Sequence, residues 1–494
     1  MITPDSPDRV YSTRLRTALV LTGSGTSAAY HAGVLRALHE AGVKIDLTAG
    51  RGVGVIGAIF AAVDGGARLW DADGIWKGPG ASHFYPPRAG LRVAAWALAG
   101  AGAVLAVPVF FLALAVLLAI VGLLLTLVGL GAAATAVTSG YARWIEVIFA
   151  PTAMPTVVPR LALFAALIAL AALCASAIPA ALMGSRRRSA GGMAGRLLGG
   201  PLTPAAVSSR CASELWRLVR GGAQAPPPSR VELGRRYLEQ LADNLGQPGF
   251  RELVLTTHDL DARRDLVFAL LHPRLRTRFF SRVSVAAGAR QAEASLGGRP
   301  GLELLDAGSR PLEAFDLAGP ARDHLLDVMD AALVIPLASD PHLLSFSAEG
   351  PWRGETHRIG DRPGSLQRLI EEVAAAGAEQ VILVSASPPP AQAHELSGSR
   401  GDLRGRAAEQ LAAFESATLR DTLEQFTGRF AGLFVVRPAH NPLGALDFEG
   451  VYDERSDRTH TLGELLDRGY EDAYRQFIEP VVGASGDSIA TVQP

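Results

Sequence analysis

The sequence has very little cysteine and lysine, and both shortages narrow the possible functions. Only Cys174 and Cys211 occur in 494 residues, and Cys174 lies in an apolar run, so we predict no structural disulfide and a reducing compartment. Lys44 and Lys77 are the only lysines, and 47 basic residues face 48 acidic ones. Because the net charge is close to zero and no nucleic-acid motif is present, we predict no nucleic-acid partner. No His, Cys and carboxylate group has metal-ligand spacing, and we predict neither a metal nor a cofactor.

Charge is absent from two long runs. Positions 93–142 and 161–185 contain no Asp, Glu, Lys, Arg or His. A membrane-crossing helix needs about 20 apolar residues, so both runs are long enough to span, whereas core helices of soluble proteins rarely stay uncharged for so long. We predict two crossings, near Val109 to Gly131 and Leu161 to Met183, with Arg92 to Val107 in the interface or against protein. Four crossings are the alternative, and they would force 141–160, with Arg143, Glu146 and three prolines, through the bilayer.

Arginines flank the apolar block on both sides. Arg88 and Arg92 precede it and Arg186 to Arg188 follow it, which the positive-inside rule assigns to the cytoplasm. The first 16 residues lack the apolar core of a signal peptide. We therefore predict a multi-pass protein of the cell (inner) membrane, in contact with membrane lipids. A stripe of small residues suits packing against the second span or a homo-oligomer partner: Ala115, Ala119, Gly122 and Thr126.

Outside this block the pattern predicts alternating strands and helices. Thr17 to Thr22 and Lys44 to Thr48 are expected strands, and Val55 to Val63 is an expected helix. Farther on, an amphipathic helix at Ser365 to Ala376 leads into a strand at Gln380 to Ser385. This alternation predicts an α/β fold with a mainly parallel sheet. The acidic tail from Asp447 to Asp472 is interpreted as a solvated helical surface.

A glycine-rich turn stands between the second strand and the next helix. Leu47 to Ala58 reads LTAGRGVGVIGA, and Gly50-Arg51-Gly52-Val53-Gly54 has the frame of a G-x-S-x-G nucleophile elbow. Small residues fit around such a turn, which accounts for Gly50 and Gly54. The central position supplies the nucleophile, and here it is Gly52, which has no side chain.

Five stretches, in this order, resemble the patatin-like phospholipase family. The family opens with a Gly-rich loop, found here as Gly23-Ser24-Gly25-Thr26-Ser27-Ala28-Ala29-Tyr30, and continues with the elbow. A strand–turn–strand at Leu255 to Leu266 and a helix running into A-I-P, here Ala332 to Pro336, are also similar. The last family motif contains the catalytic aspartate. When this motif is aligned by its distance from the strand at 380–385, the aspartate falls on Asp361.

The resemblance implies a three-layer patatin-like sandwich around the sheet, interrupted by a transmembrane helical insertion. We expect the domain in two parts, 1–90 and 201–400, with the insertion at 91–200 and an α/β extension at 401–494. In the family a serine at the elbow and the aspartate form a dyad, and backbone N–H groups of the Gly-rich loop stabilise the oxyanion. The resemblance implies that Gly52 occupies the nucleophile position, with the serine absent, and that Asp361 is the catalytic aspartate. It also implies that the oxyanion loop is formed by Gly23, Ser24, Gly25 and Thr26.

The absent hydroxyl decides the predicted function. Loss of the nucleophile removes nearly all the rate of a serine hydrolase, so we predict a weak or inactive hydrolase of phospholipid or acylglycerol esters that acts in lipid binding or regulation. One alternative is an active lipid acyl hydrolase that uses water activated by Asp361, or another nucleophile. A second is a dinucleotide-binding membrane protein, because residues 23–28 also fit G-x-G-x-x-A and Asp46 lies near the spacing of a ribose-binding acid.

Overall fold

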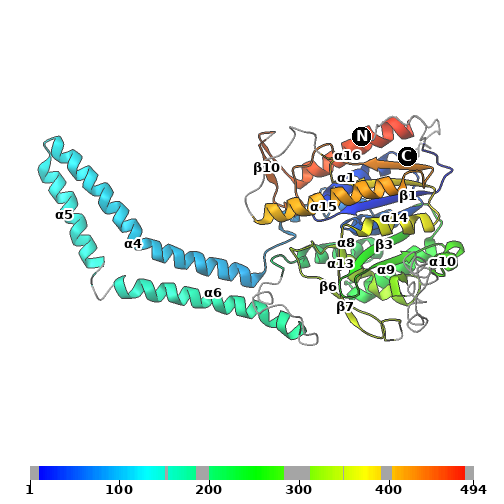
Figure 1. Cartoon of the computed structure of the whole chain (residues 1–494), viewed down its shortest axis with the longest axis horizontal. Coiled ribbons are helices and arrows are strands. Elements are labelled where there is room, and N and C mark those ends of the chain that lie inside the picture. The colour runs from blue at the N-terminus through cyan, green and yellow to red at the C-terminus, as the bar shows by residue number, and fades with distance from the viewer. Residues whose placement is uncertain are drawn as a thin grey trace, which may run out of the picture. The chain divides into compact units, whose positions relative to one another are not determined.

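The computed structural model describes residues 11–148, 150, 154–184, 200–282, 312–348, 350–390, 403–454 and 456–483. The chain divides into two compact units, one of residues 1–86 with 204–494 and one of residues 87–203. The first is an α/β unit and the second is helical (Figure 1).

The α/β unit is built on a mainly parallel sheet of nine described strands. The central order is β5-β4-β3-β2-β1-β8-β9, and β7 pairs with both β3 and β6. Strands β3, β2, β1, β8 and β9 run parallel to one another, while β4 is antiparallel to β3. The strands are β1 (Thr17–Gly23), β2 (Leu47–Gly52), β3 (Glu252–Asp259), β4 (Arg264–Leu270), β5 (Ala314–Asp316), β6 (His342–Ser345), β7 (Thr356–Gly360), β8 (Gln380–Ser385) and β9 (Gly432–Val436).

Helices cover both faces of this sheet. Alternate residues of β1 point to opposite faces, so Ala18 and Val20 pack in the core beneath α14 (Ser365–Ala375), while Leu21 contacts α2 (Gly54–Ala62). A strand buried on both faces reads as a continuous apolar run, which is how TALVLT appears in the sequence. The remaining helices in the described residues of this unit are α1 (Ser27–Glu40), α3 (Ala67–Trp70), η1 (Ala81–His83), α8 (Ala205–Arg220), α9 (Arg230–Asn244), α10 (Pro273–Phe280), η3 (Pro320–His324), α13 (Leu325–Ala332), α15 (Leu403–Phe426), α16 (Leu462–Ala473) and η4 (Tyr474–Val482).

The predicted α/β alternation is confirmed, with one strand displaced. The strand expected at Lys44 to Thr48 begins three residues later and runs to Gly52. Before it, Asp46 accepts a hydrogen bond from the Thr17 N–H at 2.9 Å and pairs with Lys44, so its side chain holds the turn that enters the strand. By contrast, the strand at Gln380 to Ser385 has the predicted bounds.

The prediction of a solvated acidic tail is wrong. The strands β10 (Val451–Asp453) and β11 (Arg458–His460) pair antiparallel, and α16 then buries Leu465 and Leu466 against α1. Two glycines make this close crossing possible. A Cβ at Gly33 would lie 1.8 Å from the Leu466 carbonyl oxygen, and one at Gly469 would lie 2.3 Å from that of Tyr30. The helix is amphipathic, and its apolar stripe belongs to the core.

The described part of the second unit contains three long helices, α4 (Ala89–Leu127), α5 (Gly131–Ile148) and α6 (Met154–Gly184). Helix α4 contains Pro108 and bends midway, and α6 runs beside its first half while α5 returns along its second half (Figure 1). Gly122 of the small-residue stripe meets Thr138 of α5, whereas Ala119 is exposed, so this part of α4 packs on α5 rather than on α6. Two segments, Ala89–Leu127 and Val157–Ala175, are long and apolar enough to cross a membrane, and their side chains are mostly exposed.

Candidate functional site

The carboxyl edge of the parallel strands gathers the residues of the predicted site. β1 ends at Gly23 and β2 at Gly52, and these two residues are register partners. β7 enters antiparallel to β3 with Gly360 opposite His258, and the next residue is Asp361. Topology therefore brings Asp361 to the end of β2, although more than 300 positions separate it from Gly52 in the sequence.

Gly52 and Asp361 are in direct proximity. Gly52 has φ of +52°, the left-handed conformation of a nucleophile elbow, and α2 begins two residues later. A Cβ built on Gly52 would lie 2.7 Å from Asp361 Oδ2 and 2.3 Å from the Gly23 carbonyl oxygen. Gly50 and Gly54 are packed just as tightly, because a Cβ at Gly50 would lie 2.5 Å from the Gly54 carbonyl oxygen. The space that a serine side chain would need at position 52 is closed by the aspartate and by the end of β1.

Arg51 occupies the centre of the site. Its Nη1 lies 2.8 Å from Asp361 Oδ1, its Nη2 lies 3.1 Å from Glu415 Oε1, and its Nε donates to Thr22 Oγ1 at 2.7 Å. The Arg51 and Asp361 side chains are each 2% exposed and that of Glu415 is 10% exposed. The sequence places Arg51 in the elbow but predicts no role for it, and it does not point to Glu415. Arg51 could have been singled out because it is the one charged residue among the glycines and valine of the elbow. Nothing in the sequence of the polar helix α15 distinguishes Glu415.

Ser24 bridges the two carboxyl groups. Its Oγ lies 2.7 Å from Asp361 Oδ2 and 2.7 Å from Glu415 Oε1. Both oxygens of Asp361 are therefore engaged, one by Arg51 and one by Ser24. Glu415, on helix α15, contacts both Ser24 and Arg51 and therefore lies beside Asp361 in the same cluster.

Burial and charge act in opposite directions on this cluster. Burial raises the pKa of Asp361, and Glu415 raises it further, against the lowering effect of Arg51 and the Ser24 hydroxyl, so that it stays above its ordinary value. Burial alone would lower the pKa of Arg51, but Asp361 and Glu415 outweigh it and raise that pKa. A buried arginine with two acidic partners is stable only while those partners remain in place.

The predicted oxyanion loop is covered by a segment from the C-terminal part of the chain. The Thr26 N–H donates to the Ala445 carbonyl oxygen at 3.2 Å, and the Thr26 hydroxyl donates to that of Gly444 at 2.9 Å. A Cβ at Gly25 would lie only 1.8 Å from the Ala445 oxygen. The Thr26 donor, predicted to face an oxyanion, is thus taken by the chain's own backbone. Gly23 accepts from the Val53 N–H at 3.0 Å, which ties the loop to the elbow.

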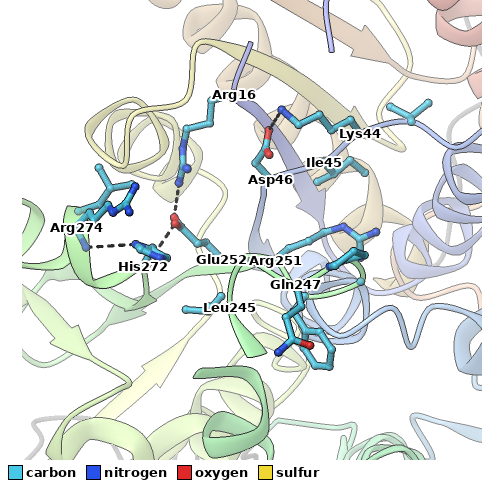
Figure 2. Close-up of a pocket in the computed structure, with 16 residues that line it drawn as sticks. Arg16, Lys44, Ile45, Asp46, Leu245, Gln247, Arg251, Glu252, His272 and Arg274 are labelled. Atoms are coloured by element: carbon cyan, nitrogen blue, oxygen red, sulfur yellow. Dashed lines mark hydrogen bonds and ion pairs between the residues drawn. The ribbon is translucent and has the colours of Figure 1, made fainter. Parts of the chain in front are cut away.

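Two cavities lie at opposite edges of the sheet. A cavity of about 690 Å³ lies at the amino ends of β1 and β2, where Arg16 pairs with Glu252 and Lys44 with Asp46 (Figure 2). Asp46 therefore faces the edge opposite the loop at 23–28, and the geometry does not support its prediction as the ribose-binding acid of a dinucleotide site. A cavity of about 840 Å³ lies beside α15 at the carboxyl edge and reaches Glu415 and Ser27.

Within the described ranges, no group of three or more His, Cys, Asp or Glu side chains is arranged to hold a metal ion.

No family model and no curated protein matches this sequence. Among solved structures, the chain is similar to VipD from Legionella pneumophila, with a TM-score of 0.25 and 9% sequence identity, covering 95% of this chain and 67% of that one.

Proposed function

We propose that this chain is a membrane-anchored, patatin-like α/β protein of lipid metabolism whose hydrolase site has become inactive, and that it acts in lipid binding or regulation. The observation that carries this proposal is Gly52 in the elbow conformation against the carboxyl group of Asp361. The frame of a serine–aspartate dyad is kept, and the hydroxyl that would form the acyl-enzyme is missing.

Three further contacts support an inactive site. Arg51 and Ser24 engage both oxygens of Asp361, so a water molecule would have to displace one of them to use this carboxylate as a base. Ala445 accepts the N–H of Thr26, which removes one donor from the oxyanion site. Removing a single such donor typically costs about 3 to 4 kcal/mol of transition-state stabilisation.

The membrane part of the proposal is supported by α4 and α6. Leu112 of α4 is 67% exposed and Phe164 of α6 is 63% exposed, as expected of side chains that face lipid. At about 1.5 Å per residue, the 39 residues of α4 extend roughly 58 Å, almost twice the hydrocarbon thickness. Only about half of α4 fits one crossing, and Pro108 separates the halves. We propose that the α/β unit lies on the cytoplasmic side, following Arg88 and Arg92.

Turnover measurements test the inactive site. Purified full-length protein in detergent, assayed on phospholipid vesicles and p-nitrophenyl esters, is expected to give the same background rate as its Asp361→Asn variant. A fluorophosphonate probe is expected to leave both unlabelled. Turnover in the native chain that Asp361→Asn abolishes would overturn the proposal.

A second candidate function follows from Ser24. Its Oγ lies 2.7 Å from Asp361 Oδ2, the position in which a dyad serine would donate its proton. In this alternative the nucleophile has moved from the elbow to the Gly-rich loop. Fluorophosphonate labelling of the native chain that is lost in Ser24→Ala would establish it.

Cysteine accessibility tests the anchor. In a background without Cys174 and Cys211, a cysteine at Ser139 in α5 is compared with one at Ser82 in the α/β unit, in sealed inside-out vesicles. We expect a membrane-impermeant maleimide to label position 82 and to spare position 139. Equal labelling of both positions would contradict the proposed arrangement.

A further inference from the structure

The cluster at the candidate site contains more hydrogen-bond acceptors than its protons can serve. The Ser24 hydroxyl has one proton, yet its oxygen lies 2.7 Å from a carboxyl oxygen on each side. If Asp361 and Glu415 were both ionised, one of these contacts would place a hydroxyl lone pair against a carboxylate. Two such short contacts require a second proton, carried by one of the carboxyl groups.

The contacts of the two acids indicate which one carries it. Glu415 Oε1 already faces the Arg51 Nη2 donor and can accept the Ser24 proton as well. Asp361 faces Arg51 with Oδ1, which leaves Oδ2 to donate to Ser24 Oγ. Asp361 is also the more deeply buried of the two side chains, 2% against 10% exposed. With this proton the cluster holds one cation and one anion, and without it a net negative charge is buried.

We propose that Asp361 is a neutral carboxylic acid and that its proton fastens helix α15, through Ser24 and Glu415, over the candidate site as a pH-sensitive latch. This deepens the proposed inactive site, because a protonated Asp361 cannot serve as a base. The structure favours a latch over a fixed core element because Glu415 is the one member of the cluster on α15 and also lines the cavity of about 840 Å³.

Four further polar or titratable groups of the described residues lie around the cluster. From the segment after η1, Tyr85 has its pKa raised mainly by burial and least by Asp361, and its hydroxyl donates to the Leu333 carbonyl oxygen. From α1, the buried His31 faces Arg51 and binds the Thr22 carbonyl oxygen. After β8, Ser387 Oγ lies 3.5 Å from Glu415 Oε2. Arg362, which follows Asp361, acts on Asp265 instead.

The direction of the pH dependence follows from burial. The pKa of Asp361 is raised in the folded chain, so its stabilising effect is complete below the ordinary aspartate value of about 3.9 and is lost as pH rises through the folded value. When the proton leaves, Asp361 and Glu415 repel each other across Ser24. Since Asp361 is fixed beside β7, the movement falls on α15.

Infrared spectroscopy tests the proton directly. We expect the full-length protein at about pH 6, two units above the ordinary aspartate pKa, to show a carboxylic-acid C=O band that Asp361→Asn removes. An unchanged band in Asp361→Asn, or no band at all, would overturn the assignment. This readout does not involve turnover, so it can fail while the proposed inactive hydrolase stands, and the reverse is also true.

Hydrogen exchange tests the latch. After correction for the intrinsic rate, amide protection in 408–419 is expected to fall roughly tenfold or more between about pH 6 and pH 9. Asp361→Asn and Glu415→Gln keep a neutral hydrogen-bonding group, and each should remove this pH dependence. Glu424→Gln, an exposed position on the same helix, should leave it intact. Protection that does not change with pH in the native chain, or that changes equally in all variants, would refute the latch.

Discussion

Restoring the missing serine is expected to damage this protein rather than to revive it. The Gly52→Ser substitution gives the elbow its family residue, but the surrounding atoms now occupy the place of that side chain. A Cβ at position 52 would lie 2.3 Å from the Gly23 carbonyl oxygen and 2.7 Å from Asp361 Oδ2. The Gly23 carbonyl oxygen belongs to the backbone at the end of the central strand β1, so it cannot rotate away as a side chain could.

The expected cost has two parts. A non-glycine residue at φ of +52° costs about 1 to 2 kcal/mol. Forcing extra atoms into a packed site typically adds about 1 to 3 kcal/mol. We therefore expect the free energy of unfolding to fall by roughly 2 to 5 kcal/mol, a large share of the roughly 5 to 15 kcal/mol that holds a typical domain together.

Urea unfolding in detergent, followed by tryptophan fluorescence, measures this cost. The matched control is Gly80→Ser, at a glycine with φ of −87° and no atom within 4 Å of its built Cβ, where the change should stay within about 0.5 kcal/mol. In the Gly52→Ser protein we also expect no fluorophosphonate labelling. A variant as stable as the native chain that gains both labelling and ester turnover would refute the reasoning, because it would show that the site still opens for a nucleophile.

Three other changes probe the contacts described above. Arg51→Gln leaves two buried carboxyl groups without their cation and should cost about 3 to 5 kcal/mol in urea unfolding, and addition of Glu415→Gln, which removes the remaining anion, should recover part of that loss; a neutral effect would mean that the ion pairs do not hold the site. Gly33→Ala should detach α16 and expose it to limited proteolysis, whereas Gly463→Ala, whose built Cβ has no atom closer than 3.8 Å, should not. Burial lowers the pKa of His31 to about 4, so the neutral form is favoured in the fold and its contribution is complete above about pH 6.5. As pH falls from 6.5 towards 4, about 3 kcal/mol should be lost, and a His31→Gln variant whose stability falls as steeply as that of the native chain would contradict this.

The sequence alone determined the local elements and the motif frame. The sequence correctly predicts strands at Thr17 to Thr22 and at Gln380 to Ser385, because strands buried on both faces have a continuous apolar sequence. The register of Asp361 against that strand predicted its place beside Gly52, and the structure brings the two together. Small residues at fixed spacing mark a tight turn whatever the rest of the chain does, so the elbow was visible without a structure.

Only the tertiary structure decided what fills the site. Arg51 lies at the end of strand β2, whereas Glu415 comes from a polar helix and Ala445 from a loop, each more than 350 positions from the elbow. Composition and periodicity record which face of an element is apolar, but they carry no information about which polar side chains meet across distant elements. The same limit explains why the sequence predicts a solvated helical surface at 447–472, since it does not show that α1 covers the apolar stripe of α16. Contacts between segments that are remote in the sequence form only when the whole chain packs together. Contacts of this kind close the candidate site.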